Sequence, residues 1–397
     1  MNATTRTATG QRARLVRPHF WESFTPEQPY AAADLAALRA GVGCEPGTVR
    51  RMWALYRVRV TEADRVSGRT PVGLVAEHAV LTLFGVHQQG RTRTVHQSGA
   101  GLGDACWALR NSGRSSPEAV GRRLAAMAGS LDLGELTHHL RAVVAQLRGA
   151  GLGLDYTRLF FDLRAWQQEG AERDRRVRAW GLQYCDLARS RARAGAGVGV
   201  AEATDVVAAG GQEPDVLGFD AERTPFWDTY VPSMPGAGAN LAALRSGVNR
   251  EAGAVPAMWH LYRTTVSLYE QRTGALGRPL AAEHAALALF GVHQHGRRRT
   301  MHTSGVSLGM ACGNLRRSAQ GSAEALERRF ANILTSVDSH ELAQHLRGLV
   351  PMLGGAEQPL DYGLLRADLL GWDDRERQSR IRSRWDKAYR AGGTPSY

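Results

Sequence analysis

The chain contains the same sequence pattern twice. Residues 76–110 read AEHAVLTLFGVHQQGRTRTVHQSGAGLGDACWALR, and residues 282–316 read AEHAALALFGVHQHGRRRTMHTSGVSLGMACGNLR. The two segments are identical at 24 of 35 positions, at a constant offset of 206 residues. The same offset relates Trp166 to Trp372 without a gap, and the register slips only after Trp372. A fixed period of this kind indicates one structural unit that is present twice.

The repeat divides the 397 residues into four parts. We expect a disordered basic tail over 1–19, a first helical domain over 20–193, a flexible acidic linker over 194–223 and a second helical domain over 224–392. The linker is rich in Gly and poor in aromatic residues, which is typical of a flexible coil. A coil of about 30 residues spans roughly 30 Å. The two copies can therefore lie head to tail as well as side by side.

Apolar residues recur at helical spacing in each copy. Leu136, Leu140, Val144 and Leu147 follow the 3.6-residue period of one helix face. Ser116 before Pro117 has the pattern of a helix start. The expected helices of the first copy cover 31–40, 49–60 (capped by Thr48), 72–89, a segment from 117, a segment after the capping-box pair Asp132 and Glu135, 155–166, and a charged helix after that, with counterparts in the second copy. No segment alternates at period two, so the sequence predicts an all-α fold of two homologous helical bundles.

Net charge is distributed unevenly along the chain. The total is +12, made up of +11 over residues 1–200, −6 over 201–222 and +7 over 223–397. Two basic bodies thus flank an acidic segment. Basic surfaces of this kind suit a polyanion, because each Arg placed on a phosphate releases a condensed counterion.

Arginine clusters recur at matching places in the two copies. They lie in the loop after the 72–89 helix, in the helix that starts at Pro117, and near the end of each copy. The candidate nucleic-acid-binding residues are Arg39, Arg91, Arg93, Arg122, Arg123, Arg173, Arg175, Arg245, Arg297, Arg298, Arg299, Arg328, Arg329, Arg375 and Arg377. Aromatic residues do not interleave with them, so we expect contacts to the nucleic-acid backbone rather than base stacking. A helical scaffold whose basic faces dock acidic protein partners is the alternative.

The residue pattern does not favour catalysis. The histidines match no zinc motif, and there is no P-loop, GxSxG or Cys–His signature, so we predict no catalytic residue, no metal, no cofactor and no small-molecule substrate. His78 follows Glu77 within an apolar helix, which favours a hydrogen-bonded interior pair. The four cysteines (Cys44, Cys106, Cys185 and Cys312) form no disulfide pattern, which favours a cytoplasmic location. No apolar stretch is long enough to span a membrane.

The order of motifs resembles a known family. The run AEHA, LFGVHQxG, MHxSGVSLG and LRRS, followed by ERRF, ELAQHLRGLV, LDYGLL and WDDRERQ, is similar to the CasB family, over about 20–184 and 226–389. That family is the small subunit of Cascade, the type I-E CRISPR interference complex. The resemblance implies an all-helical, non-catalytic protein that lies as a head-to-tail pair in Cascade and braces the guide RNA–target DNA hybrid and the displaced strand. It also implies that this chain supplies both members of the pair, with other Cascade subunits as partners.

The resemblance also places the family's nucleic-acid contacts. The second Arg of the ERRF-like motif falls on Arg123 and Arg329, and the WxxRER motif gives Arg375. The first copy reads WQQEGAERDRR in that region, so Arg173 or Arg175 is an approximate counterpart. The family's early L-R-R motif is incomplete in both copies, since Arg39 is followed by Ala40 and Arg245 by Ser246.

Overall fold

A computed structural model describes residues 18–168, 170–185, 224–318 and 322–391. Across these residues the secondary structure is helical, with two isolated β-bridges (His96 to Leu154, and His302 to Leu360) and no strand. The all-α prediction is therefore confirmed. None of the described helices is both long and apolar enough to cross a membrane. The predicted acidic linker, and the predicted tail up to residue 17, lie outside the described residues.

The two copies have the same order of elements. In the first copy these are α1 (Phe20–Ser23), α2 (Ala31–Ala40), η1 (Arg50–Leu55), α3 (Glu62–Ser67), α4 (Val72–Gln88), α5 (Leu102–Asn111), α6 (Pro117–Gly129), α7 (Leu133–Ala150), α8 (Tyr156–Trp166) and α9 (Ala171–Cys185). In the second copy they are α11 (Phe226–Thr229), α12 (Ala237–Ser246), η2 (Pro256–Leu261), α13 (Leu268–Thr273), α14 (Arg278–His293), α15 (Leu308–Arg317), α16 (Ala323–Thr335), α17 (Ser339–Gly355), α18 (Tyr362–Gly371) and α19 (Arg375–Ala391).

The apolar helix near the middle of each copy forms the core. Helix α4 packs against α2, α7 and α8, and α14 packs against their counterparts α12, α17 and α18. Phe84 is fully buried and meets the Tyr156 ring edge to face at 5.2 Å between centroids, and Phe290 and Tyr362 do the same at 5.1 Å. Gly85 lets α2 approach α4, because a Cβ there would overlap the side chain of Leu38.

The segment 49–60 differs from the prediction. It is not one α-helix capped by Thr48, but a short 3₁₀ helix, Arg50–Leu55, followed by extended backbone. The Thr48 hydroxyl donates to the carbonyl of Glu45 and caps nothing.

Glu77 explains why that helix stops. Its carboxylate is fully buried and accepts from the backbone N–H groups of Arg57 (2.8 Å) and Val58 (2.9 Å). A buried carboxylate needs such donors, and a continuing helix would turn these N–H groups away. His78 bonds instead to the Tyr56 hydroxyl (2.7 Å). The predicted interior Glu–His pair is thus buried and hydrogen-bonded, with each residue holding the 41–58 segment.

Two helix starts follow the predicted capping chemistry, since the side chains of Ser116 and Asp132 each accept a backbone N–H in the first turn of their helices. Asp155, which was expected within the helix 155–166, instead caps α8 in the same way. The expected capping box at Asp132 is only half formed, because the Glu135 carboxylate accepts from the N–H of Leu131. The sequence pattern did not predict helices α3 and α5 or their counterparts α13 and α15, which the structure contains.

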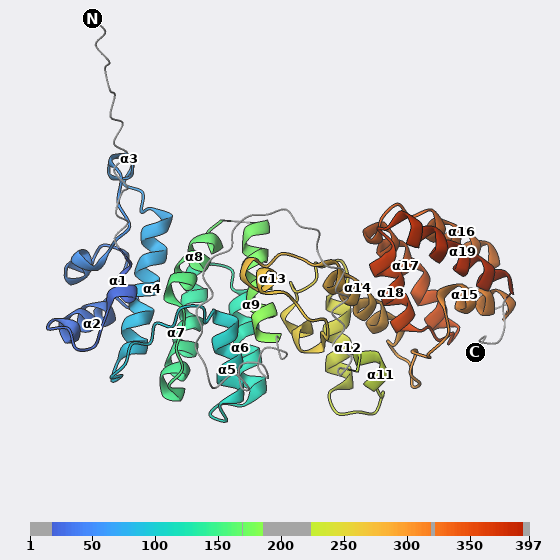
Figure 1. The fold of residues 1–397 in the computed structure, drawn as a ribbon, viewed down its shortest axis with the longest axis horizontal. Helices are drawn as coiled ribbons and strands as arrows, with labels where there is room; N and C mark the ends of the chain where they lie inside the picture. The colour runs from blue at the N-terminus through green and yellow to red at the C-terminus, as the bar shows by residue number, and fades with distance from the viewer. Residues whose placement is uncertain (1–17, 169, 186–223, 319–321, 392–397) are drawn as a thin grey trace, which may run out of the picture.

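The two copies lie end to end along the long axis of the molecule (Figure 1). Helix α9, at the end of the first copy, packs against η2 and α13 of the second. In Figure 1, α2 and α3 of the first copy lie toward one end of the body, and α19 of the second copy lies toward the other. The order is head to tail, since the end of one copy meets the early elements of the next.

Candidate nucleic-acid interface

A buried glutamine shapes the arginine-bearing loop of each copy, residues 91–94 and 297–300. In the first copy the Gln88 amide donates to the carbonyls of Arg91 (3.2 Å) and Arg93 (2.9 Å), and its oxygen accepts from the N–H of Val95 (2.9 Å). Gln294 makes the same three bonds in the second copy, to the backbone of Arg297, Arg299 and Met301. Both glutamines are about 1% exposed or less. Each loop therefore has a fixed backbone.

The side chains of these loops face outward to different degrees. Arg93, Arg298 and Arg299 are exposed, whereas Arg91 and Arg297 are half-buried. Arg91 lies over Gly151 at the end of α7, and it lines a cavity of about 420 Å³ with Arg93 and the 151–153 segment. Arg297 lies 3.8 Å from the carboxylate of Glu357. The exposed guanidinium groups are accessible to a phosphate.

A buried histidine anchors the base of each loop. His87 precedes Gln88, and its Nδ1 lies 2.8 Å from the hydroxyl of Tyr156 while its Nε2 donates to the carbonyl of Leu152 at 2.9 Å. Burial lowers the pKa of His87 to about 4, so the ring is neutral at neutral pH. His293 pairs with the Tyr362 hydroxyl at 2.9 Å, and burial lowers its pKa to about 4 as well.

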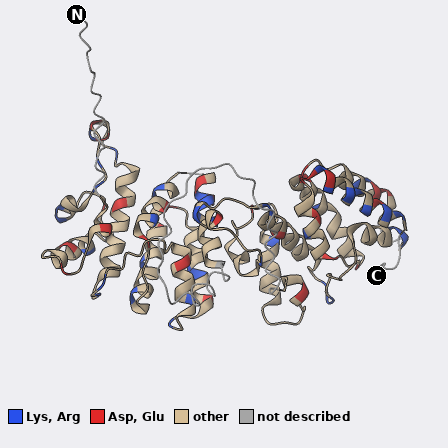
Figure 2. Ribbon diagram, viewed as in Figure 1, with Lys and Arg blue, Asp and Glu red and all other residues tan. Residues whose placement is uncertain are grey.

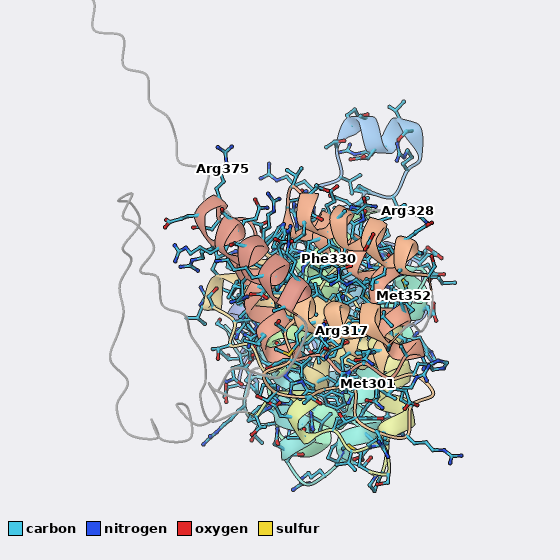
Figure 3. The ribbon with its side chains drawn as sticks, turned by 90° about the vertical axis from the view of Figure 1, so that its right-hand side faces the viewer. Met301, Arg317, Arg328, Phe330, Met352 and Arg375 are labelled. Carbon is cyan, nitrogen blue, oxygen red and sulfur yellow. The ribbon has the colours of Figure 1, made fainter. Side chains whose placement is uncertain are left out.

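Helices α16 and α19 form the second basic surface. They pack through Phe330 and Tyr389, whose rings stack at 4.5 Å. Arg328 and Arg375 extend outward from the upper edge of this pair, while Phe330 points inward (Figure 3). Arg329 is also exposed and lies against Gly348 of α17. Figure 2 shows Lys and Arg positions gathered along α16 and α19, with Asp and Glu positions among them.

Acidic neighbours on this surface leave most of the arginines accessible. Arg328 lies 4.0 Å from Glu324, but both side chains are more than 70% exposed, so water screens the pair. Arg375 and Arg377 are both exposed at the start of α19. The surface thus presents cations on two adjacent helices.

The equivalent region of the first copy is different. Arg122 is exposed, but Arg123 is half-buried and its Nη1 is buried without a hydrogen-bond partner. Arg173 lies over the Trp166 ring, 4.3 Å from its centroid, and donates to the carbonyls of Ser130 and Leu131. Arg173 therefore holds the turn between α6 and α7, and a nucleic-acid contact at Arg173 stays a prediction.

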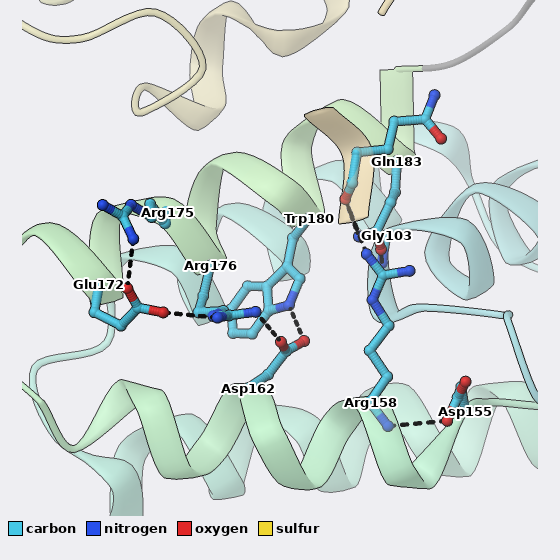
Figure 4. A network of polar contacts seen from close by, with 10 residues as sticks. Gly103, Asp155, Arg158, Asp162, Glu172, Arg175, Arg176, Trp180 and Gln183 are labelled. Atoms are coloured by element: carbon cyan, nitrogen blue, oxygen red, sulfur yellow. Dashed lines mark hydrogen bonds and ion pairs between the residues drawn. The ribbon is translucent and has the colours of Figure 1, made fainter. Parts of the chain in front are cut away.

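Arg175 is exposed but belongs to an ion-paired row on α9 (Figure 4). Its Nη1 donates to the Glu172 carboxylate at 3.0 Å, and Arg176 donates to the other oxygen of Glu172 at 2.7 Å. Arg176 also lies 3.6 Å from the buried Asp162. Glu172 thus neutralises part of the charge that the sequence placed here.

Arg39 and Arg245 lie in the last turns of α2 and α12. Both are half-buried, and both are distant in sequence from the arginine loops. The structure therefore distributes the predicted residues over a loop surface, a helix-pair surface and these two helix ends.

The described residues contain no cluster of side chains suited to a metal ion. Among them no group of three or more His, Cys, Asp or Glu side chains is placed to hold a metal ion. Cys106 and Cys312 are fully buried, and burial raises the pKa of the Cys106 thiol to about 12. A thiol of this kind packs as a small apolar side chain.

Gln88 and Gln294 are the important site residues that sequence reasoning missed. The signal was present, because the repeat keeps a Val-His-Gln run before both loops. A glutamine at the end of an apolar helix is equally consistent with a helix end that is exposed to solvent. Only the burial of Gln88 and Gln294 shows that each one supports a loop.

Comparison with known proteins gives the class. A family model described as CRISPR-associated protein Cse2 matches the chain twice, over residues 34–184 and 240–389. The solved structure of CasB from Thermobifida fusca is similar, with 31% identity, a TM-score of 0.30, and coverage of 39% of this chain and 85% of that one. A Cse2-family CRISPR-associated protein from Thermus thermophilus shows 23% identity, a TM-score of 0.32, and coverage of 42% and 94%. No curated protein matches the chain.

The protein is thus CRISPR-associated, and its two halves are of one kind. The chain belongs to the Cse2 family, also called CasB, and carries two members of that family in tandem. The resemblance noted in the sequence is confirmed.

Proposed function

We propose that this protein is a non-catalytic small subunit of a type I-E Cascade complex, fused as a covalent pair. Its basic surfaces contact the sugar–phosphate backbone of the guide RNA, the target DNA and the displaced strand, and so stabilise the R-loop. In such complexes base pairing reads the sequence, while protein supplies a positive channel and holds the unpaired strand. Its protein partners are the other Cascade subunits.

The paired arginine loops carry this proposal. Each loop is held by three bonds from a fully buried glutamine. The first loop presents the exposed Arg93, and the second presents the exposed Arg298 and Arg299. The core therefore fixes the backbone of the loop and leaves its side chains to solvent. Exposed like charges on a rigid loop are not expected to stabilise the fold, so their recurrence in both copies favours a phosphate ligand.

The fusion adds a thermodynamic argument. When one copy is bound, the second copy is held near its own site at an effective concentration on the order of millimolar for a linker that spans the gap. Two weak backbone-binding surfaces then act as one stronger one. This arrangement suits a ligand that runs along the length of the molecule.

The test is the salt dependence of binding to a fluorescently labelled mixed-sequence single-stranded DNA. One variant reverses three loop charges (Arg93→Glu, Arg298→Glu and Arg299→Glu), and a second reverses three helix charges (Arg122→Glu, Arg329→Glu and Arg375→Glu). A control variant makes the same change in net charge at exposed arginines outside the set (Arg51→Glu, Arg59→Glu and Arg164→Glu). Circular dichroism checks that all three remain folded.

Each lost phosphate contact reduces the slope of log K against log salt by about 0.7 for a single strand. The loop and helix variants should each bind more weakly, with a slope shallower by about 2. The control should lose affinity without that change in slope. Equal slopes in all three variants and the wild type would contradict the proposal. Lost binding of these variants to acidic protein partners, together with unchanged DNA binding, would instead favour the scaffold alternative.

A further inference from the structure

The contact between the two copies is specific in its chemistry. We define the tail face of the first copy as Arg178, Gly181 and Gln183, on α9. Arg178 donates to the carbonyl of Gly274 (2.6 Å) and to the carboxylate of Glu251 (2.6 Å). The Gln183 amide donates to the carbonyl of Gln271 at 2.9 Å, and the same carbonyl accepts from Arg158.

An indole ring and a glycine complete the fit. Trp259 of η2 lies flat against Gly181, where any Cβ would overlap the ring. Gly274, at a φ of 68°, lies against the backbone of Arg175 and has no room for a side chain. The ring of Trp259 is only 3% exposed as a result. We define the head face of the second copy as Glu251, Gly253, Trp259 and Gly274.

The first copy has the same head face, formed by Glu45, Gly47, Trp53 and Gly68 at the offset of 206. The Trp53 Nε1 donates to the carbonyl of Gly47 at 2.7 Å, and the Trp259 Nε1 donates to that of Gly253 at the same distance. Gly68 has a φ of 66°. The ring of Trp53 is therefore held in the conformation that Trp259 uses for binding. Yet the Trp53 residue is 60% exposed.

The second copy does not have the same tail face. Trp180 and Trp385 occupy equivalent places, since they donate to Asp162 and Asp368 respectively and stack on Trp166 and Trp372. With those tryptophans aligned, residues 178–183 read RAWGLQ and residues 383–388 read SRWDKA. This alignment takes into account the shift in register between the two copies after Trp372.

Each change removes one element of the contact. Ser383 replaces Arg178 and has no guanidinium for the acidic residue. Asp386 replaces Gly181 and brings a Cβ and a carboxylate to the place where the indole would lie. Ala388 replaces Gln183 and has no amide. The exposed side chains of Arg384 and Lys387 add charge where the first copy has Ala179 and Leu182, both buried.

We propose that the head face of the first copy is a docking surface for another protein, one that presents a helix of the α9 type. Such a helix carries an arginine for Glu45 and, three residues later, a glycine on which Trp53 lies flat. A second copy of this chain is not that partner. Among the described residues its one tail face of this type is already covered by its own head face, and the other has been altered.

The full-length chain can be used to test whether the head face of the first copy binds a matching tail face. Transferring residues 178–183 onto 383–388 takes five substitutions: Ser383→Arg, Arg384→Ala, Asp386→Gly, Lys387→Leu and Ala388→Gln. Because Arg384 pairs with the buried Asp368, a second graft keeps Arg384 and makes the other four. Each graft is also combined with Trp53→Ala. Circular dichroism confirms folding, and sedimentation velocity over a range of concentrations measures association.

The wild type should sediment as a monomer at all concentrations. At least one folded graft should show a sedimentation coefficient that rises with concentration, and Trp53→Ala should abolish the rise. Grafts that stay monomeric would overturn the proposal, because the head face would then not bind its matching tail. Association of the wild type through Trp53 would also overturn it, since the native second tail would then not be excluded.

Discussion

Replacing Trp259 with alanine should weaken the contact between the two copies, and Trp53→Ala is its matched control. Both tryptophans bond to a glycine carbonyl at 2.7 Å, so each variant loses one similar hydrogen bond. The two residues differ in exposure, at 3% for Trp259 and 60% for Trp53. The difference between the two variants therefore isolates what the ring contributes to the contact between copies.

The size of that contribution follows from the area covered. A tryptophan buries about 150–250 Å² when it is fully covered. The exposed areas of Trp53 and Trp259 differ by somewhat more than half of that amount. The contact therefore covers on the order of 100 Å² of the ring, which is about 2.5 kcal/mol at roughly 25 cal/mol per Å². We expect Trp259→Ala to lower the free energy of unfolding by about 2.5 kcal/mol more than Trp53→Ala. For a domain of this size the melting temperatures should differ by roughly 5–10 °C.

Urea unfolding and thermal unfolding followed by circular dichroism give the two free energies. Small-angle X-ray scattering adds a second readout, because a weakened contact should increase the longest dimension of Trp259→Ala and leave that of Trp53→Ala unchanged. Equal destabilisation of the two variants, with identical scattering curves, would refute the reasoning. The contact would then depend on Arg178 and Gln183 rather than on the indole.

Two further predictions concern the base of the arginine loops. Burial lowers the pKa of His87 and His293 to about 4, below the value of about 6.5 in an unfolded chain, so the unfolded state binds more protons between those values. The stability of the protein should be fully present above pH 6.5 and fall as the pH drops toward 4, by up to about 3 kcal/mol for each histidine. His87→Gln should flatten this part of a stability–pH profile measured by urea unfolding, and an unchanged profile would contradict the assignment. Gln294→Leu should cost about 1–3 kcal/mol, because the buried N–H of Met301 loses its acceptor. It should also weaken DNA binding at constant net charge, whereas Gln344→Leu, at an exposed position, should change neither.

The sequence predicted the fold because its strongest signals are local. The central helix, the caps at Ser116 and Asp132, and the 3.6-residue pattern of α7 depend on residues close together in the chain, and the structure agrees with each. The helix expected over 49–60 failed because its end is set by Glu77, a residue of a different helix. No local pattern contains that information.

Side-chain environment was less predictable than secondary structure. Arg173 and Arg122 are both arginines near a repeated motif, yet one stacks on Trp166 while the other is exposed. The contact between the copies was hidden for a similar reason, since Trp53 and Trp259 occur in equivalent motifs. Gly181 was the available signal, because glycine within a helix is unfavourable by about 1 kcal/mol and marks a close approach.

Gln88 and Gln294 fix the backbone of each arginine loop without contacting its charged side chains. They bind only backbone atoms of the loop, so a substitution at its solvent-facing positions leaves all three bonds in place. The duplicated chain has already diverged there, with Thr92 in the first loop and Arg298 in the second. After the duplication, the charge of each loop can therefore change independently, one residue at a time, while the bonds that hold its backbone stay in place.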